Sequence, residues 1–270
     1  MIYSDLNIHL CAGDSLSKLL QDDFTLQCPS LLERVQQSLV LTDSELNSAN
    51  LMLFNQILSV NHVESVSLFC SEYLDKKIFL TLLASPEHIT SYDQLYSLRL
   101  AGLSSITFHS YHQSITKSKY PHYAKLAGWA EELKMAILVD GSYGTLDIYN
   151  INNLEFVAYL ASLVKNIPIV IMHSGGARVL EAMLLVESSS NLFLETSFTL
   201  PYYTGSSVEK DLAFAYKKIG PERVVYASDH PYIYHEDSLA AVLKFFDKYD
   251  FSLSDQDWIL RDTFSRIFVS

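Results

Sequence analysis

Cysteine is scarce in this chain, with three residues (Cys11, Cys28 and Cys70) among 270. Their number is odd and none of them has CxxC spacing, which excludes a disulfide framework and a zinc knuckle. The simpler interpretation is that they are buried or half-buried free thiols in a reducing compartment.

Basic side chains are also few, with 19 Lys and Arg against 31 Asp and Glu and a net charge of -12. The longest basic run is Lys76-Lys77. Nucleic acids and anionic membranes bind basic surfaces, so neither is an expected partner. We expect a small-molecule substrate instead, and the sequence leaves open whether the chain forms a homo-oligomer.

Long apolar runs are absent, and no stretch approaches the length of a membrane span. The segment Met1–Asp5 has neither the basic nor the apolar region of a signal peptide, so we expect a cytoplasmic protein. The chain has no P-loop, no glycine-rich dinucleotide turn and no GxSxG elbow. No repeat and no Pro/Gly/Ser-rich linker divides it, which predicts one domain over residues 1–270.

Hydrophobic residues make up 49% of the chain, enough for a substantial core. Short apolar runs rich in β-branched residues recur, with helical patterns between most of them. They predict strands at 2–10, 63–69, 78–83, 105–108, 136–139, 167–172, 192–194 (extending to 196) and 223–227. Alternating strands and helices predict an α/β fold with a parallel sheet, and eight units favour a (β/α)8 TIM barrel. Only about eight residues separate the second and third runs, so an open doubly wound sheet is the alternative.

Helix signals lie between several of these runs. Capping-box spacing occurs at Ser30 with Glu33 and at Thr42 with Glu45. Further helices are predicted over 154–164, over 208–219 before Gly220-Pro221, and from Ser254 to Phe268.

The carboxyl ends of barrel strands carry the chemistry in this fold class, so their residue types are informative. Alternation along the first strand places Asp5, Asn7 and His9 on one face. The other predicted strand ends are His109 with Tyr111 and His112 beyond it, Asp140, His173, Glu195-Thr196-Ser197 and Asp229-His230. Histidine and aspartate supply metal ligands and acid–base groups. Four of the chain's nine histidines fall at these ends, which indicates an active site.

The order of these endings resembles the amidohydrolase superfamily, in its amidohydrolase-related branch with decarboxylases and lactonases. Each segment that carries the resemblance is similar to a family signature at one barrel strand. They are Ser105–His109 at strand four, Pro168–Gly176 at strand six, Asn191–Ser197 at strand seven and Pro221–Pro231 at strand eight.

The resemblance implies a role for each strand-end residue. Asn7, His9, Asp140 and Asp229 would hold a divalent metal (zinc, manganese or magnesium). Asp229 and His173 would be catalytic, and His109, Tyr111 and His230 would touch the substrate. Three positions depart from the family: Asn7 replaces the first histidine of a His-x-His pair, Asp140 replaces a ligand histidine, and Thr263 replaces an asparagine.

We therefore expect a divergent hydrolase that acts on a small amide, ester or lactone through a metal-activated water. Three alternatives stay open: a decarboxylase of the same family, a metal-independent lactonase, and a non-catalytic barrel that has lost its metal site. The structural alternative for Asp229 is a carboxylate that caps the loop after strand eight. For His173 it is a ring hydrogen-bonded under the Gly175-Gly176 turn.

Overall fold

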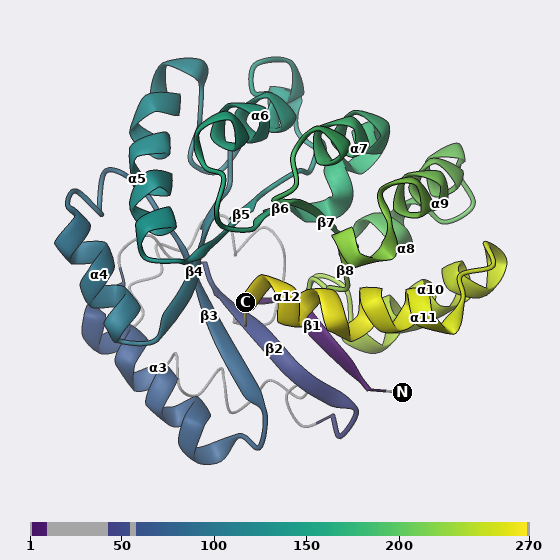
Figure 1. Ribbon diagram of the computed structural model, residues 1–270, viewed down its shortest axis with the longest axis horizontal. Coiled ribbons are helices and arrows are strands. Elements are labelled where there is room, and N and C mark those ends of the chain that lie inside the picture. Colours follow the sequence, from purple (N-terminus) through teal and green to yellow (C-terminus); the bar gives the residue numbers. More distant parts are fainter. Residues whose placement is uncertain (1, 10–42, 55–57, 269–270) are drawn as a thin grey trace.

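Eight strands form one parallel sheet whose spatial order follows the chain, in a computed structural model that describes residues 2–9, 43–54 and 58–268 (Figure 1). The strands are β1 Tyr3–His9, β2 Leu46–Leu53, β3 Lys77–Leu83, β4 Leu103–Phe108, β5 Ala136–Val139, β6 Ile169–Ile171, β7 Leu192–Glu195 and β8 Val224–Val225. Every neighbouring pair from β1–β2 to β7–β8 is parallel.

The sheet closes because the segment that contains β8 returns to β1. Three backbone hydrogen bonds cross this seam: Leu6 N to Tyr226 O (3.2 Å), Asp229 N to Asn7 O (2.9 Å) and His9 N to His230 O (2.7 Å). The predicted (β/α)8 barrel is therefore confirmed, and the open doubly wound sheet is wrong.

Helices surround the strands, as Figure 1 shows. The α-helices are α3 Val60–Tyr73, α4 Tyr92–Leu100, α5 Tyr120–Glu132, α6 Asn153–Leu163, α7 Val179–Ser188, α8 Thr199–Tyr203, α9 Ser207–Ile219, α10 His235–Lys248, α11 Leu253–Asp257 and α12 Thr263–Phe268. Short 3-10 segments cover Lys117–Lys119, Leu146–Tyr149, Met172–Arg178 and Pro221–Arg223, and a π-helical turn covers Trp258–Asp262. Within the described ranges, no helix has the length and apolar character needed to cross a membrane.

The core has two layers because successive strand residues point to opposite faces. Leu138, Val170 and Phe193 belong to a cluster inside the barrel, whereas their chain neighbours pack outward against the helices. Phe264 of α12 joins the inner cluster and lies 5.6 Å from Phe79 near the start of β3, measured between ring centroids. The C-terminal helix therefore covers the amino ends of the strands, opposite to the ends where the candidate site lies.

The prediction of a second strand at 63–69 is wrong. Those residues belong to α3, which buries Val63, Val66 and Cys70 at helical spacing. The actual second strand, β2, is rich in polar residues, and its Asn50 donates to Leu6 O (2.8 Å) and accepts from Thr81 Oγ1 (2.8 Å) inside the barrel. β2 is held in the barrel by buried hydrogen bonds of polar side chains, so it lacks the apolar pattern on which the strand prediction was based.

Two predicted helix starts are also wrong. Thr42 lies outside the described residues, and Glu45 comes immediately before β2 rather than opening a helix. At the C-terminus, Ser252 caps α11 with Asp255, two residues before the predicted Ser254. The Ser30–Glu33 signal, Cys11 and Cys28 lie outside the described residues, and Cys70 is a buried free thiol.

Gly141, two residues after the end of β5, allows two strand ends to approach each other closely. A methyl group at this position would lie 2.3 Å from the Met172 carbonyl oxygen. We expect Gly141→Ala to lower the free energy of unfolding by about 1–3 kcal/mol, because neighbouring backbone would have to move. Urea denaturation measures this change. Gly144→Ala is the matched control, since nothing lies within 4 Å of its added carbon, and equal losses in both variants would contradict this account.

Candidate active site

The carboxyl ends of β1 and β8 bring together three of the predicted site residues. Asp229 Oδ1 accepts a hydrogen bond from Asn7 Nδ2 at 2.9 Å and lies 3.2 Å from His9 Nε2. All three side chains are buried, and Asp229 adopts a left-handed backbone with φ 65°. Both nitrogens meet the same oxygen, Oδ1.

A second group of predicted residues lies at the ends of β4, β5 and β6. His109 Nδ1 is 3.7 Å from Asp140 Oδ2, and His173 Nε2 is 3.6 Å from Asp140 Oδ1. Asn153 at the start of α6 donates to Asp140 Oδ2 (3.1 Å), and the Ser142 backbone N–H donates to Oδ1 (3.1 Å). These bonds fix a buried carboxylate between two imidazole rings.

Residues after β7 connect the two groups, because β7 lies between β6 and β8. The hydroxyl of Ser197 is 3.0 Å from His173 Nδ1 and accepts from Asn7 Nδ2 at 3.4 Å. Glu195 accepts from the backbone N–H groups of His173 (2.6 Å) and Ser197 (3.0 Å). A hydrogen-bonded chain therefore runs from the β1–β8 group to His173.

His173 begins a stretch of left-handed backbone that continues through Ser174, Gly175 and Gly176, with φ between 49° and 77°. Left-handed conformations are unfavourable for residues with a Cβ and occur where the surroundings impose them. Here the surroundings are the Glu195 carboxylate on His173 N and the Ser174 hydroxyl, which donates to Glu195 O (2.6 Å). The pair holds the imidazole of His173 at the strand ends.

Burial and charge act in opposite directions on the two predicted catalytic groups. Burial alone would raise the pKa of Asp229, but hydrogen bonds from His9 and Asn7 and the nearby His173 hold it below its ordinary value. Burial alone would lower the pKa of His173, but the carboxylates of Asp229, Glu195 and Asp140 raise it. The surroundings therefore favour the charged form of both groups, the carboxylate of Asp229 and the imidazolium of His173.

Aromatic rings border this polar centre. Phe54, directly after β2, lies 5.5 Å from the rings of both His9 and His109, and Tyr232 lies 5.1 Å from His9 (centroid distances). Tyr111 lies near Asp140, and its buried hydroxyl has no hydrogen-bonding partner among the described residues. His230 faces His235 of α10, with their ring centroids 5.9 Å apart.

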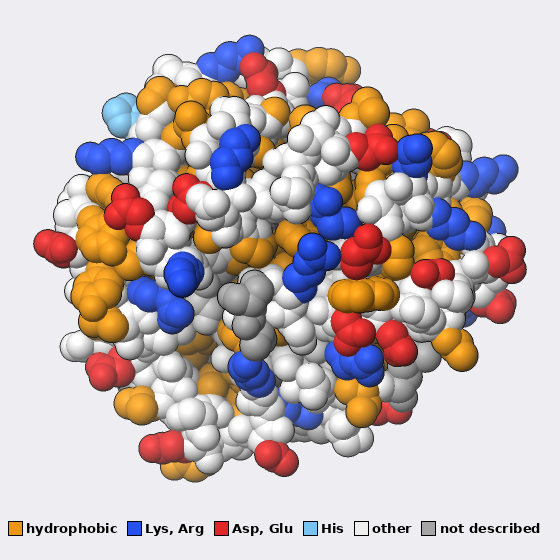
Figure 2. All heavy atoms as spheres, in the orientation of Figure 1, with side chains coloured by type: hydrophobic (Ala, Val, Ile, Leu, Met, Phe, Trp, Pro, Cys, Tyr) orange, Lys and Arg blue, Asp and Glu red, His pale blue; other side chains and the backbone are white. Residues whose placement is uncertain are grey.

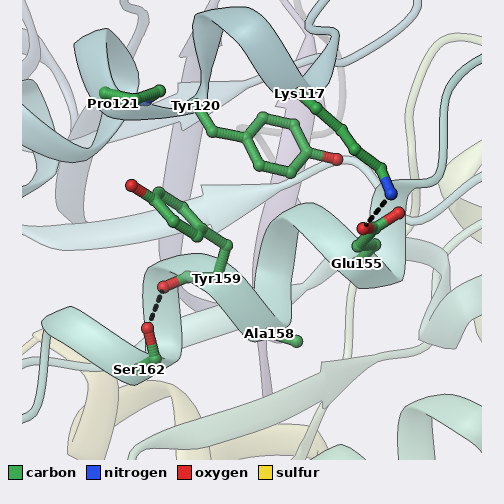
Figure 3. Close-up of a pocket in the computed structure, with 7 residues that line it drawn as sticks. All are labelled: Lys117, Tyr120, Pro121, Glu155, Ala158, Tyr159 and Ser162. Atoms are coloured by element: carbon green, nitrogen blue, oxygen red, sulfur yellow. Dashed lines mark hydrogen bonds and ion pairs between the residues drawn. The ribbon is translucent and has the colours of Figure 1, made fainter.

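The surface outside the barrel mouth differs in character. On the face drawn in Figure 2, Lys and Arg side chains lie among Asp and Glu rather than in one stripe. A groove between α5 and α6, drawn in Figure 3, is lined by Tyr120, Tyr159 and the Lys117–Glu155 ion pair (2.6 Å). It contains none of the predicted site residues.

A family model described as amidohydrolase matches residues 96–268, which is more than half of the chain. The chain belongs to the amidohydrolase family. A search of curated proteins finds none that matches it.

Solved structures support the fold of this amidohydrolase at low sequence identity. An uncharacterised TIM-barrel protein from Bordetella bronchiseptica is 14% identical with a TM-score of 0.71, covering 100% of this chain and 99% of that one. A putative 2-pyrone-4,6-dicarboxylic acid hydrolase from Pseudomonas putida is 17% identical (TM-score 0.65, 99% and 97% covered). A dihydroxybenzoic acid decarboxylase from Polaromonas sp. JS666, with bound manganese and 2-nitroresorcinol, is 11% identical (TM-score 0.58, 99% and 97% covered).

The donor set of this amidohydrolase does not fit the divalent metal that the family implies. In residues 2–9, 43–54 and 58–268, no group of three or more His, Cys, Asp and Glu side chains could hold a metal ion. His9 and Asn7 point their nitrogens at Asp229 Oδ1, whereas Asp140 is engaged by Asn153 and Ser142. The predicted ligands thus satisfy one another and other protein groups in this structure.

Three residues with close contacts in the site had no predicted role. Glu195 and Ser197 were recognised only as the polar end of strand seven, and Phe54 follows a strand that the sequence patterns missed. The Glu-x-Ser alternation could have placed Glu195 and Ser197 on one face. Nothing in the local sequence of Phe54 indicated that it would reach two histidines.

Asp5 lies in the seam, where Oδ1 accepts from the backbone N–H groups of Asn7 (3.1 Å) and Ser228 (2.9 Å). Complete burial raises its pKa from 3.8 to about 7, despite those hydrogen bonds. A pKa raised in the folded state gives stability that is present below pH 3.8 and is lost as the pH rises through 7. Ionisation of Asp5 therefore opposes folding at neutral and alkaline pH.

We expect Asp5→Asn to remove this penalty, because an amide oxygen still accepts both backbone hydrogen bonds. The free energy of unfolding of the variant, minus that of the wild type, should increase by about 2 kcal/mol from pH 5 to pH 8. Urea denaturation at both values measures it. Asp93→Asn, on the exposed surface of α4, is the charge-matched control and should show no such increase. A pH-independent difference for Asp5→Asn would show that Asp5 does not titrate in this range.

Proposed function

We propose that this amidohydrolase hydrolyses a small ester, lactone or amide by general acid–base catalysis at the carboxyl ends of its barrel strands, with Asp229 and His173 as the catalytic pair. The observation that supports it most is the buried pair of groups whose pKa values shift in opposite directions. Opposite shifts of neighbouring titratable groups are typical of an acid and a base assigned to separate roles.

In this mechanism Asp229 is the base. Its carboxylate takes a proton from a water molecule as the water oxygen attacks the carbonyl carbon of the substrate. His9 and Asn7 keep the carboxylate ionised and fixed through Oδ1. A buried, pre-oriented base needs little reorganisation during the reaction.

His173 is the acid. Its imidazolium donates a proton to the leaving oxygen or nitrogen when the bond to the carbonyl carbon breaks. Asp140, 3.6 Å from Nε2, favours the charged ring and its orientation. His109 and Tyr111 border Asp140 from the β4 side and are positioned to contact the substrate, as is Phe54. His230, which faces His235, is also proposed to contact the substrate.

Decarboxylation of a small aromatic acid is the second candidate function. It is favoured by the structural similarity to a dihydroxybenzoic acid decarboxylase. The proton of His173 would then go to the ring carbon that loses carbon dioxide. A turnover survey should therefore include carbon dioxide release from hydroxybenzoates beside the hydrolysis of nitrophenyl esters, lactones and nitroanilides.

Asp229→Asn and His173→Gln test the catalytic pair on whichever compound the survey identifies. We expect Asp229→Asn to lower kcat at least about 100-fold, because general base catalysis contributes that much. Wild-type kcat should fall as the pH rises through the raised pKa of His173, and His173→Gln should lose this alkaline limb. Turnover should persist after dialysis against a chelator.

Asp93→Asn serves as the control for removal of one carboxylate, and thermal melting verifies that each variant is folded. If the wild type turns over none of these compounds and Asp229→Asn leaves ligand-induced stabilisation unchanged, the chain is a non-catalytic barrel. Activity that chelator removes and zinc or manganese restores would instead establish the metal-assisted reaction.

Whether these strand ends can form a metal centre is tested by reversing the two ligand positions that depart from the family pattern, Asn7 and Asp140. Asn7→His combined with Asp140→His supplies imidazole ligands on either side of His9 and Asp229. We expect zinc to bind at least about tenfold more tightly than to the wild type, measured by competition with a chromophoric chelator. Asn7→His alone is the intermediate control. Unchanged zinc affinity in the double variant would show that these strand ends do not converge as a metal centre.

A further inference from the structure

Phe198, which lies between β7 and α8, has a backbone conformation and an exposure that are both unusual for a phenylalanine. Its φ is 55° and its ψ is −45°, a region that residues with a bulky side chain rarely adopt. Its side chain is 37% exposed, although a large apolar side chain stabilises a fold mainly through burial. Strained residues of this kind cluster at binding and active sites, where a side chain is required in one place.

Hydrogen bonds connect Phe198 and the start of α8 to His173. The hydroxyl of Thr199, the first residue of α8, donates to the carbonyl oxygen of His173. The backbone N–H of Tyr202 donates to the carbonyl oxygen of Phe198 (2.9 Å). The segment that carries the Phe198 ring is therefore fixed to the segment that carries the imidazole of His173.

Phe198 and Tyr202 together form an aromatic surface beside His173. Their rings are stacked, with centroids 5.1 Å apart and planes inclined by 21°. Tyr202 is 65% exposed, and the Phe198 ring meets the His173 ring edge-on at a centroid distance of 6.3 Å. We call these two side chains the Phe198–Tyr202 pair. A planar aromatic group can stack on such a pair or meet it edge-on, and either geometry adds to the gain from apolar burial.

We propose that the Phe198–Tyr202 pair binds a planar aromatic group on the part of the substrate that departs, so that the preferred substrates are aryl esters and anilides. This inference rests on the proposed function, in which the departing oxygen or nitrogen lies at His173. It depends on where that atom lies and not on the charge of the imidazole. An aryl group joined to the departing atom reaches the pair because the Phe198 ring lies beside that of His173. A lactone would leave the pair unused, since its departing oxygen stays joined to the acyl part.

Two isomeric esters test on which side of the scissile bond the ring binds. Phenyl acetate carries its ring on the departing oxygen, and methyl benzoate carries it on the carbonyl carbon. The ratio of their kcat/KM values is compared between the wild-type full chain and its variants, because the intrinsic reactivities of the two esters cancel in this comparison. We expect Phe198→Leu and Tyr202→Leu each to lower the ratio of phenyl acetate to methyl benzoate about threefold or more, since the aromatic contact is lost while an apolar side chain remains.

Binding of a compound that cannot be hydrolysed is measured on the same proteins, without turnover. The probe is para-fluorophenylacetone, in which a methylene group replaces the departing oxygen of an aryl acetate, and ¹⁹F NMR titration gives its dissociation constant. We expect the wild type to bind it and the two leucine variants to bind it about threefold or more weakly. Phe214→Leu is the matched control, because Phe214 is 56% exposed on α9, and it should change neither the ester ratio nor the affinity. Thermal melting verifies that each variant is folded.

A ketone that does not bind, or that binds equally tightly to the wild type and to both leucine variants, would overturn the inference even if esters are hydrolysed. Slower turnover of methyl benzoate with unchanged turnover of phenyl acetate would also overturn it, because the pair would then contact the acyl part. Failure of the proposed function is recognised separately. In that case no ester, amide or lactone is turned over, while the ketone still binds and Phe198→Leu still weakens its binding.

Discussion

The closure of the barrel between β1 and β8 is the constraint on which the candidate site depends. Asp5 accepts backbone hydrogen bonds from Asn7 on one side of this seam and Ser228 on the other. The Asp229 N–H then bonds to Asn7 O. The Asp5 carboxylate thus bridges β1 and the segment after β8. This bridge sets the distance between the ends of the two segments, so that the Asn7 side chain reaches Asp229. The register of β1 against β2 shifts between Asp5 and Ile8, so β1 is adjusted where it meets the seam.

Placing several carboxylates and imidazoles in one barrel mouth is costly unless they satisfy one another. The molecule meets this requirement by alternating the two kinds of group. Asp229 lies among His9, Asn7 and His173, and Asp140 lies between His109 and His173. Glu195 satisfies backbone N–H groups and adds to the field on His173. Asn7 on β1 and Asp140 after β5, the two ligand positions that depart from the resembled pattern, both belong to this hydrogen-bonded network.

The left-handed stretch at His173 connects this network to the fold. Two glycines tolerate such a backbone, but His173 and Ser174 do not adopt it without support. Glu195 and the neighbouring strand supply that support, and Gly141 leaves room for it by letting the Met172 carbonyl approach. The same packing that builds the barrel wall therefore sets the direction of the imidazole.

The sequence by itself determined the barrel and the types of residue at most strand ends. Strand runs, helix stops and the spacing of His9, His109, Asp140, His173 and Asp229 are local properties, and local patterns are readable along the chain. The same reasoning failed at β2, because the polar Asn50 belongs to a strand whose hydrogen-bonding partners, Leu6 and Thr81, come from other strands.

Only the tertiary structure decided which atoms meet. Asn7 contacts Ser197 and Asp229 across 190 and 222 residues of chain, and no local pattern encodes contacts of that separation. The contacts of Asn7 with Ser197 and with Asp229 follow from the closure of the sheet. The residue types determine which chemical groups each strand end offers. The order and closure of the strands determine which of those groups come into contact.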